Sequence, residues 1–268
     1  VICLHKATDS GRDQMVFLLQ KESGQSYVLK KDFIAGNPWI EREFQHFQRL
    51  KPHFDKVDHS ASVEPLYLGN DKSFHICRFI EGRTASETLR ETNNPKQVNQ
   101  VFRRAGRWLD HLHRFQAPKP EQIWTNWIFT EAKTLMGVQG IHATPDHFEG
   151  FLEQLLRDAE AFQGSASQRV FAHGDFHSSN LILGKGTAYG LDLAYAKEKP
   201  FLYDVVDFLL SDINLPLNLN EIGPGGIHWN SVEFFFKTYR FDVAPSLLNF
   251  HLRAGLLLRL LKFRTERV

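Results

Sequence analysis

The sequence has little cysteine, little methionine and almost no net charge. Two of its 268 residues are cysteine and two are methionine. The pair Cys3 and Cys77 cannot build a disulfide framework, and neither lies in a cluster with zinc-site spacing. Lysine and arginine (32) nearly balance aspartate and glutamate (31), so the chain as a whole has no field that attracts nucleic acid. We therefore expect a cytoplasmic protein that binds no nucleic acid.

Long apolar runs are also missing. No stretch of about 18 consecutive apolar residues occurs, so neither a membrane-spanning helix nor a secretory signal is expected. Apolar residues make up 42% of the chain and charged residues 24%, which is the composition of an ordinary folded protein. A chain of this length can bury a substantial core as one large domain or two small ones.

Short apolar runs separated by turn residues fill the first eighty positions. Strands are predicted over five ranges: 1–6, 15–20, 27–30, 62–68 and 73–80. Between the third and fourth ranges, Ile40, Phe44 and Phe47 recur at helical spacing, and Glu43 lies at the edge of that face. The pattern therefore predicts an antiparallel five-stranded sheet with one helix.

After about residue 80 the apolar spacing changes to that of helices. Thr84 and Glu87 fit a capping box, and Asn94 is followed by a proline at the first helical position. Further helices are predicted over three ranges: from about 144 onward, with Leu155 and Leu156 directed inward, 231–239 and 245–263. Short strands are predicted over 170–172, 181–183 and 189–193. This half is thus mainly helical.

The densest polar cluster of the sequence runs from His173 to Asn180, between two short apolar strands. Asp175 and Asn180 are five positions apart, and Asp192 follows twelve positions later, within the predicted strand. Loops held between strands commonly present catalytic groups. This spacing is that of a kinase catalytic loop followed by a metal-binding aspartate.

The segment resembles the catalytic loop of the aminoglycoside phosphotransferase and choline kinase superfamily, in which Gly174 takes the place of the protein-kinase arginine. The resemblance implies an α+β, two-lobed, protein-kinase-like fold. The N-lobe would cover residues 1–80 and the mainly helical C-lobe residues 81–268. The implied activity is transfer of the terminal phosphate of ATP or GTP to a hydroxyl of a small molecule, with Mg²⁺.

The resemblance also implies a role for each polar residue of this segment. Asp175 would orient the acceptor hydroxyl and take its proton, while Asn180 and Asp192 would hold Mg²⁺ through the hard oxygen ligands that this ion prefers. His173 would fix the loop, and Asp204 would anchor it from the following segment. His177 lies between the fixed positions and fits either a loop filler or a residue on the substrate side.

The resemblance predicts nucleotide-binding residues in the first eighty positions. Lys30 would hold the phosphates and pair with Glu43, with Lys31 and Glu41 as the nearby alternatives. Four further residues are expected to contact the nucleotide through their backbone: Ser10 and Gly11, in a loop with a single glycine, at the phosphates, and Arg78 and Ile80, at the lobe connection, at the adenine.

The acceptor is left open between choline-like, sugar and aminoglycoside alcohols. Possible contacts for a cation are the carboxylates Asp146, Glu149 and Glu153 and a cage of Trp124, Trp127 and Trp229. Solvated helix faces and core tryptophans explain all of these residues at least as well, and the composition favours that explanation. The basic tail from residue 241 argues modestly against a polycation bound near the C-terminus, and its leucines fit core packing better than a place on a membrane surface.

Two other functional classes remain. One is a kinase-shaped module that binds nucleotide without catalysis, which the glycine-poor loop would suit. The other is a hydrolase with a metal ion held by His173, Asp175 and His177, since imidazole and carboxylate groups ligate zinc and iron.

Overall fold

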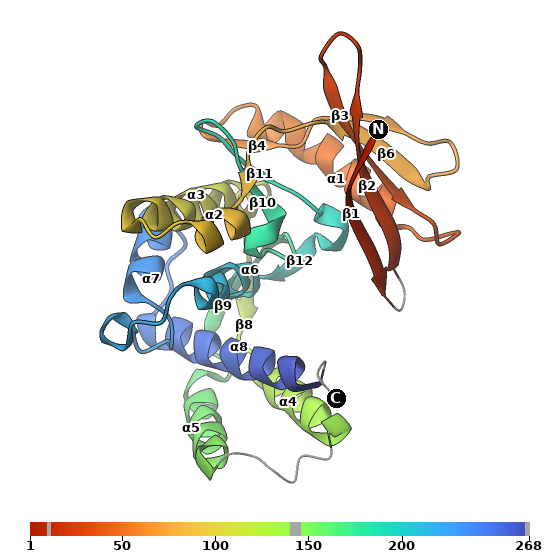
Figure 1. Cartoon of the computed structure of the whole chain (residues 1–268). Helices are drawn as coiled ribbons and strands as arrows, with labels where there is room; N and C mark the ends of the chain where they lie inside the picture. The colour runs from red at the N-terminus through yellow and green to blue at the C-terminus, as the bar shows by residue number, and fades with distance from the viewer. Residues whose placement is uncertain (10–11, 140–145, 266–268) are drawn as a thin grey trace.

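The computed structural model describes residues 1–9, 12–139 and 146–265 (Figure 1). Its strands are β1 (Ile2–Asp9), β2 (Arg12–Gln20), β3 (Ser26–Asp32), β4 (Ser60–Ser62), β5 (Pro65–Leu68), β6 (Phe74–Arg78), β7 (Arg83–Thr84), β8 (Lys119–Gln122), β9 (Ala166–Ala172), β10 (Leu181–Leu183), β11 (Ala188–Gly190) and β12 (Lys197–Pro200). Its α-helices are α1 (Trp39–Phe54), α2 (Ala85–Glu91), α3 (Pro95–His113), α4 (Asn126–Gln139), α5 (Asp146–Phe162), α6 (Leu202–Leu209), α7 (Trp229–Phe236) and α8 (Pro245–Thr265).

The smaller lobe is a five-stranded sheet in the order β1-β2-β3-β6-β5, in which every neighbouring pair is antiparallel. Helix α1 packs on this sheet against β5, β6 and β3 (Figure 1). The sheet and the single helix confirm the sequence prediction. Ile40, Phe44 and Phe47 are buried on the inner face of α1, as their spacing predicts, and Glu43 is buried beside them.

One predicted strand is wrong in its extent. The range 62–68 is divided into β4 and β5, which belong to different sheets. Strand β4 runs parallel to β11 in a four-stranded sheet of the order β4-β11-β10-β7, whereas β5 pairs with β6. The sequence shows one continuous apolar run here because Val63, which lies between the two strands, is also buried.

The larger lobe is mainly helical and contains a third, three-stranded sheet, β12-β9-β8. The capping box at Thr84 and the proline start after Asn94 are formed as predicted, at α2 and α3. Helix α4 was not predicted. In α5, Leu155 is fully buried but Leu156 is 43% exposed, which corrects the predicted inner face. Two adjacent leucines are about 100° apart around a helix, so a narrow contact face accommodates only one of them.

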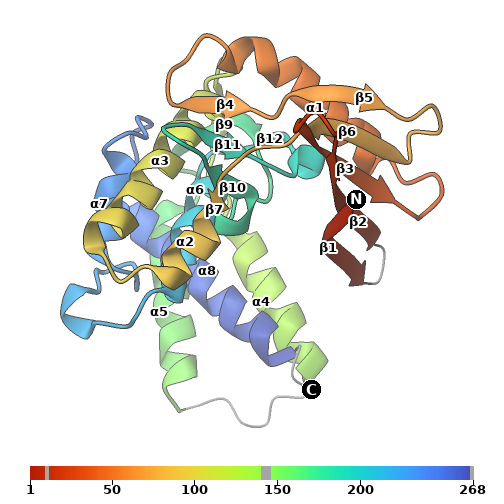
Figure 2. The ribbon, with the colours of Figure 1, turned by 45° about the horizontal axis from the view of Figure 1, so that its top comes forward.

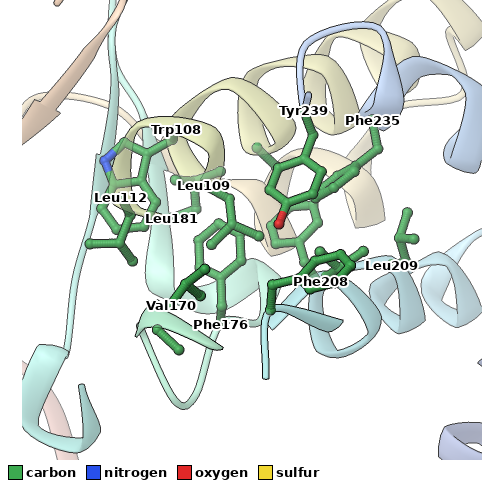
Figure 3. Close-up of a cluster of buried hydrophobic side chains, with 14 of the residues drawn as sticks. Trp108, Leu109, Leu112, Val170, Phe176, Leu181, Phe208, Leu209, Phe235 and Tyr239 are labelled. Carbon is green, nitrogen blue, oxygen red and sulfur yellow. The ribbon is translucent and has the colours of Figure 1, made fainter. Parts of the chain in front are cut away.

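The main core lies between α3, α6, α7 and the catalytic-loop segment (Figure 3). Trp108 is fully buried and stacks between Phe54 and Phe176, with ring centroids 5.4 and 5.3 Å away. Phe176 also stacks on Phe208 at 4.9 Å. Since Phe176 immediately follows Asp175, this aromatic stack fixes the polar loop to the rigid centre of the larger lobe.

A second apolar cluster joins α4, α5 and α8, which Figure 2 shows as a separate group of helices below the sheets. Leu257 and Leu261 of α8 are buried in this cluster. The leucines of this helix therefore pack mainly on other helices, as expected. Among the described residues, no helix is both long enough and apolar enough to cross a membrane.

Candidate active site

The loop after β9 is fixed through its backbone. Asp204 accepts hydrogen bonds from the backbone N–H groups of His173 and Gly174, at 2.6 and 2.9 Å. Gly174 adopts a left-handed conformation with φ +87°, and a Cβ atom there would lie 2.4 Å from the carbonyl oxygen of Tyr195. Only glycine fits this position without displacement of the backbone. Both the backbone conformation and the hydrogen bonds are therefore fixed at the start of the loop.

Asp204 is itself completely buried, and the side chain of His113 contacts its carboxylate. The His113 Nε2 atom lies 3.0 Å from the Asp204 carboxylate, and Nδ1 lies 2.8 Å from the Tyr239 hydroxyl. Burial favours the neutral acid, but the hydrogen bond from His113 and the nearby imidazoles outweigh burial and lower the pKa of Asp204. Sequence reasoning missed His113, because it is brought to Asp204 by packing between α3 and α6.

Asp175 lies on the solvent side of the loop, opposite the buried Phe176. Its side chain is 34% exposed, and its carboxylate lies 3.8 Å from His177 Nε2. Asn180 donates from Nδ2 to the backbone carbonyl of Asp175 at 2.9 Å. This bond directs the amide nitrogen of Asn180 into the loop and leaves its Oδ1 atom available as a ligand.

Asp192 lies beyond the end of β11 and not within a strand, which corrects the prediction. The backbone of the preceding Leu191 bonds to the loop instead. Its N–H donates to the backbone carbonyl of Asn180 at 2.9 Å, and its carbonyl accepts from His173 Nε2 at 2.7 Å. The chain then turns through a left-handed conformation at Asp192, with φ +55°. His173 therefore connects the loop to the segment that carries Asp192.

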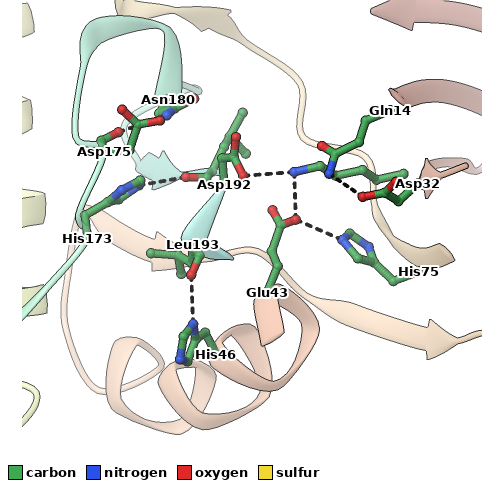
Figure 4. A network of polar contacts seen from close by, with 12 residues as sticks. Gln14, Asp32, Glu43, His46, His75, His173, Asp175, Asn180, Asp192 and Leu193 are labelled. Carbon is green, nitrogen blue, oxygen red and sulfur yellow. Dashed lines mark hydrogen bonds and ion pairs between the residues drawn. The ribbon is translucent and has the colours of Figure 1, made fainter. Parts of the chain in front are cut away.

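Lys30, Glu43 and Asp192 converge from three separate parts of the chain. Figure 4 shows Glu43 and Asp192 at this contact, with His75 next to Glu43. The Lys30 Nζ atom lies 2.7 Å from Glu43 Oε2 and 2.9 Å from Asp192 Oδ1. Burial disfavours the ammonium group, but the two carboxylates outweigh burial and raise the pKa of Lys30. Burial likewise favours the neutral form of Glu43, yet the charge of Lys30 and the hydrogen bond from His75 hold the pKa of Glu43 at about 2. Lys30 and Glu43 are therefore both ionised at neutral pH.

The oxygen atoms at this site suit Mg²⁺. Asn180 and Asp192 offer amide and carboxylate oxygens, and Mg²⁺ binds with few protein ligands and completes its shell with phosphates and water. Among the described residues, no group of three or more His, Cys, Asp or Glu side chains is arranged to hold a metal ion. His173 uses Nε2 to bond Leu191 and buries Nδ1. The set His173, Asp175 and His177 therefore does not form a hydrolytic metal site here.

The remaining predicted nucleotide contacts are backbone groups of Ser10, Gly11, Arg78 and Ile80. Ser10 and Gly11 lie outside the described residues. Arg78 ends β6, and its backbone N–H already donates to the Glu64 carbonyl at 3.0 Å. Ile80 follows the strand, and among the described residues its backbone groups form no hydrogen bond. Ile80 is thus better placed than the N–H of Arg78 to contact a base.

A pocket of about 800 Å³ opens beside Asp175, between α4, α6, α8 and the β8–β9–β12 sheet. Its wall includes Trp124 and Trp127, together with Lys199 and Tyr203. Trp229 and Glu153 are not part of this wall, so the proposed three-tryptophan cage is not formed. The side chains of Asp146 and Glu149 lie outside the described part of the structure.

Sequence reasoning also missed Lys199, whose side chain is close to the catalytic loop. Its Nζ atom donates to the Gly174 carbonyl at 3.1 Å and lies 3.9 Å from the ring centroid of Tyr203. The only signal in the sequence was a short run with alternating lysines, Lys197 and Lys199, which is also typical of an exposed strand.

Comparison with known proteins gives a family match. The family model described as the phosphotransferase enzyme family matches residues 5–226. This range includes Lys30, Glu43, Asp175, Asn180 and Asp192. No curated protein sequence matches the chain.

Solved structures with the same fold are numerous, at low sequence identity. A spectinomycin phosphotransferase solved with ADP and spectinomycin matches with a TM-score of 0.61 and 13% identity, over 97% of this chain and 80% of that one. A macrolide 2'-phosphotransferase from Brachybacterium faecium gives 0.58 and 13%, over 98% and 84%. An aminoglycoside 3'-phosphotransferase of type VIII gives 0.56 and 13%, over 95% and 93%. These likenesses establish the two-lobed kinase-like fold.

Proposed function

Because the chain belongs to the phosphotransferase enzyme family, we propose that it transfers the terminal phosphate of ATP or GTP to a hydroxyl of a small molecule. One observation carries the proposal: Lys30 contacts both Glu43 and Asp192, at 2.7 and 2.9 Å. The two carboxylates keep the Lys30 ammonium group charged and fixed in position, and in kinases a lysine held in this way binds the nucleotide phosphates. The reaction would take place in the cytoplasm, between the lobes of residues 1–80 and 81–268.

Each site residue then has a defined task. Asp175 orients the acceptor hydroxyl and takes its proton as the oxygen bonds to phosphorus, while the bond from phosphorus to the leaving diphosphate oxygen breaks. Lys30 holds the phosphates of the nucleotide, and Glu43 holds Lys30. Mg²⁺, bound by Asn180 and Asp192, supplies neutralisation of the phosphate charge. His173 and Asp204 keep the loop in place, as their hydrogen bonds indicate.

Backbone groups complete the nucleotide site in this proposal. Ile80, and the carbonyl of Arg78, contact the base, and the amides of Ser10 and Gly11 contact phosphate. Such contacts need no particular side chain, which is consistent with a loop that contains a single glycine.

The substitution Asp175→Asn tests the proposed chemistry. The amide keeps the shape of the side chain but cannot take a proton, so turnover should fall by about 10² to 10⁴. Nucleotide binding should change little, since Asp175 does not contact Lys30 or Asp192. The measurement is nucleotide diphosphate release with a panel of alcohols, alongside nucleotide affinity by calorimetry.

The matched control is Asp242→Asn, at an exposed position distant in sequence from the loop. It should keep wild-type turnover. Equal turnover of Asp175→Asn and wild type would remove the proton-accepting role. A wild-type protein that binds nucleotide but turns over no alcohol in the panel would favour the non-catalytic nucleotide-binding module.

A further inference from the structure

The carboxylates of the pocket beside Asp175 are neutralised by basic side chains of the same protein. Four carboxylates besides Asp175 line the pocket, and each has an ion-pair partner. The pairs are Glu121 with Arg169, Glu198 with Lys119, Asp207 with Arg259 at 2.8 Å, and Glu131 with Lys262 at 3.6 Å. A pocket for a polycation requires several carboxylates whose charge is free to meet the ligand. In this pocket only Asp175 lacks a lysine or arginine partner among the described residues.

Strand β12 instead contributes two lysines to the wall of the pocket. Lys197 and Lys199 are two positions apart in this strand, so their side chains leave it on the same side. Both line the pocket, and neither forms an ion pair within the described ranges. Lys197 is exposed, while Lys199 is half-buried, with its Nζ atom 3.1 Å from the Gly174 carbonyl. An acidic group of a ligand placed between Asp175 and β12 would meet both lysines.

The wall of the same pocket also contains aromatic surface and oxygens without a hydrogen-bond partner. Trp124 and Trp127 are 61% and 49% exposed, although tryptophan in a folded protein is usually well covered. Glu121 Oε2 and Ser167 Oγ are buried without a hydrogen-bond partner, and the two residues face each other in the β8–β9 ladder. Both residues line the pocket. Buried oxygens of this kind are costly unless a ligand or water hydroxyl bonds to them.

We infer that the acceptor is an acidic, ring-containing alcohol and not a polycation. This inference rests on the proposed function, because it names the acceptor of that reaction. The ring lies against Trp124 and Trp127, a further hydroxyl bonds to Glu121 Oε2 or Ser167 Oγ, and the carboxylate or phosphate group is bound by the lysines of β12. The reacting hydroxyl is held by Asp175.

Three phenyl glycosides that differ only at one carbon atom test the charge preference. Phenyl β-D-glucuronide carries a carboxylate there, phenyl β-D-glucopyranoside a hydroxymethyl group, and phenyl 6-amino-6-deoxy-β-D-glucopyranoside an ammonium group. Their affinities are measured by calorimetry with the wild-type protein in the presence of Mg²⁺ and ADP. The glucuronide should bind on the order of tenfold tighter than the amine, because two lysines attract the one and repel the other.

The variant Lys197→Gln should reduce this preference severalfold, since it removes one exposed charge without changing the fold. The control Lys56→Gln, at an exposed lysine outside the pocket wall, should leave it unchanged. Any of four results would overturn the inference: tighter binding of the amine, equal binding of the three glycosides, no binding of any of them, or an unaltered preference in Lys197→Gln.

Titration with Mg²⁺-ATP in the absence of glycoside separates this inference from the proposed function. A protein that binds Mg²⁺-ATP but prefers the ammonium glycoside fails the inference alone. A protein that prefers the glucuronide but does not bind Mg²⁺-ATP or Mg²⁺-GTP retains an acidic-ligand pocket and fails the proposed function.

Discussion

A single ammonium group at Lys30 holds two carboxylates that come from different parts of the chain. Glu43 is nearly inaccessible to solvent, so its charge depends on Lys30 and on His75, whose Nε2 atom lies 3.3 Å away. Asp192 is more exposed, and under the proposed function a nucleotide phosphate would replace it at Lys30. Glu43 thus keeps the lysine in position while Asp192 is free to exchange partners.

The substitution Glu43→Gln should destabilise the protein by about 2 kcal/mol at pH 7, because a buried charged hydrogen bond is lost. The pKa of Glu43 is about 2 in the folded protein and ordinarily 4.5, so its contribution is complete above pH 4.5 and is lost as the pH falls toward 2. The stability difference between wild type and variant should therefore shrink over that interval. Urea unfolding between pH 3 and pH 7 measures it.

Glu41→Gln is the matched control, because Glu41 lies on the same helix and pairs with Lys72 at a more exposed site. Its effect should be small, since exposed ion pairs contribute about 0–1 kcal/mol. A pH-independent difference for Glu43→Gln would show that the carboxylate does not gain its low pKa from folding.

The sequence predicts these residues to different degrees. Lys30 and Glu43 were found because a strand lysine and a helix glutamate stand in order, thirteen positions apart. The contact of Lys30 with Asp192 spans 162 positions and depends on how the lobes meet. His75 and His113 were missed, since each is recognisable only through the carboxylate that it contacts.

At the scale of elements, two separate attachments hold the catalytic loop in place. Asp204 at the start of α6 binds the backbone of His173 and Gly174, and Phe176 enters the aromatic core. Asp175 lies between these two attachments. Its position is thus determined by the buried Asp204 carboxylate on one side and by the aromatic core of the larger lobe on the other.

Gly174→Ala should reduce both stability and turnover. Its Cβ atom would meet the Tyr195 carbonyl at 2.4 Å, in addition to the cost of about 1–2 kcal/mol for a left-handed alanine. Gly24→Ala is the control, because Gly24 has nearly the same φ, +83°, and no atom within 4 Å of the added carbon. Thermal unfolding and turnover are measured on both variants. Equal effects would show that backbone strain alone, and not the contact with Tyr195, explains the glycine.

The errors in the predicted elements have a common cause. The strand predicted over 62–68 is divided between two sheets, and Asp192 lies in a turn, although both segments have strand-like side chains. In each case the partner of the backbone decides the structure: β11 pairs with β4, and the catalytic loop binds Leu191. Local apolar spacing contains no information on these partners. The long helices, whose burial pattern is local, were predicted well in α1 and α3.

At the scale of the whole molecule, the Lys30–Asp192 contact joins the five-stranded sheet to the lobe that carries the catalytic loop. His46 adds a second connection, since its Nδ1 atom lies 2.8 Å from the Leu193 carbonyl. Helix α1 therefore contacts the segment around Asp192 both through Glu43 and Lys30 and through His46. A ligand that binds between these elements should stabilise the folded chain as a unit.

Mg²⁺-ATP should raise the thermal unfolding temperature of the wild-type protein, and Asp192→Asn should lose the part of this shift that depends on the metal. A ligand at a hundred times its dissociation constant, bound only to the folded state, stabilises by about 2.7 kcal/mol. Removal of Mg²⁺ with EDTA should lower the wild-type shift to that of the variant, because both changes remove the metal from the phosphates. The control Asp242→Asn should behave as wild type. If ATP with EDTA stabilises wild type as strongly as Mg²⁺-ATP does, Asp192 does not bind the metal, and Lys30 with the backbone accounts for nucleotide binding.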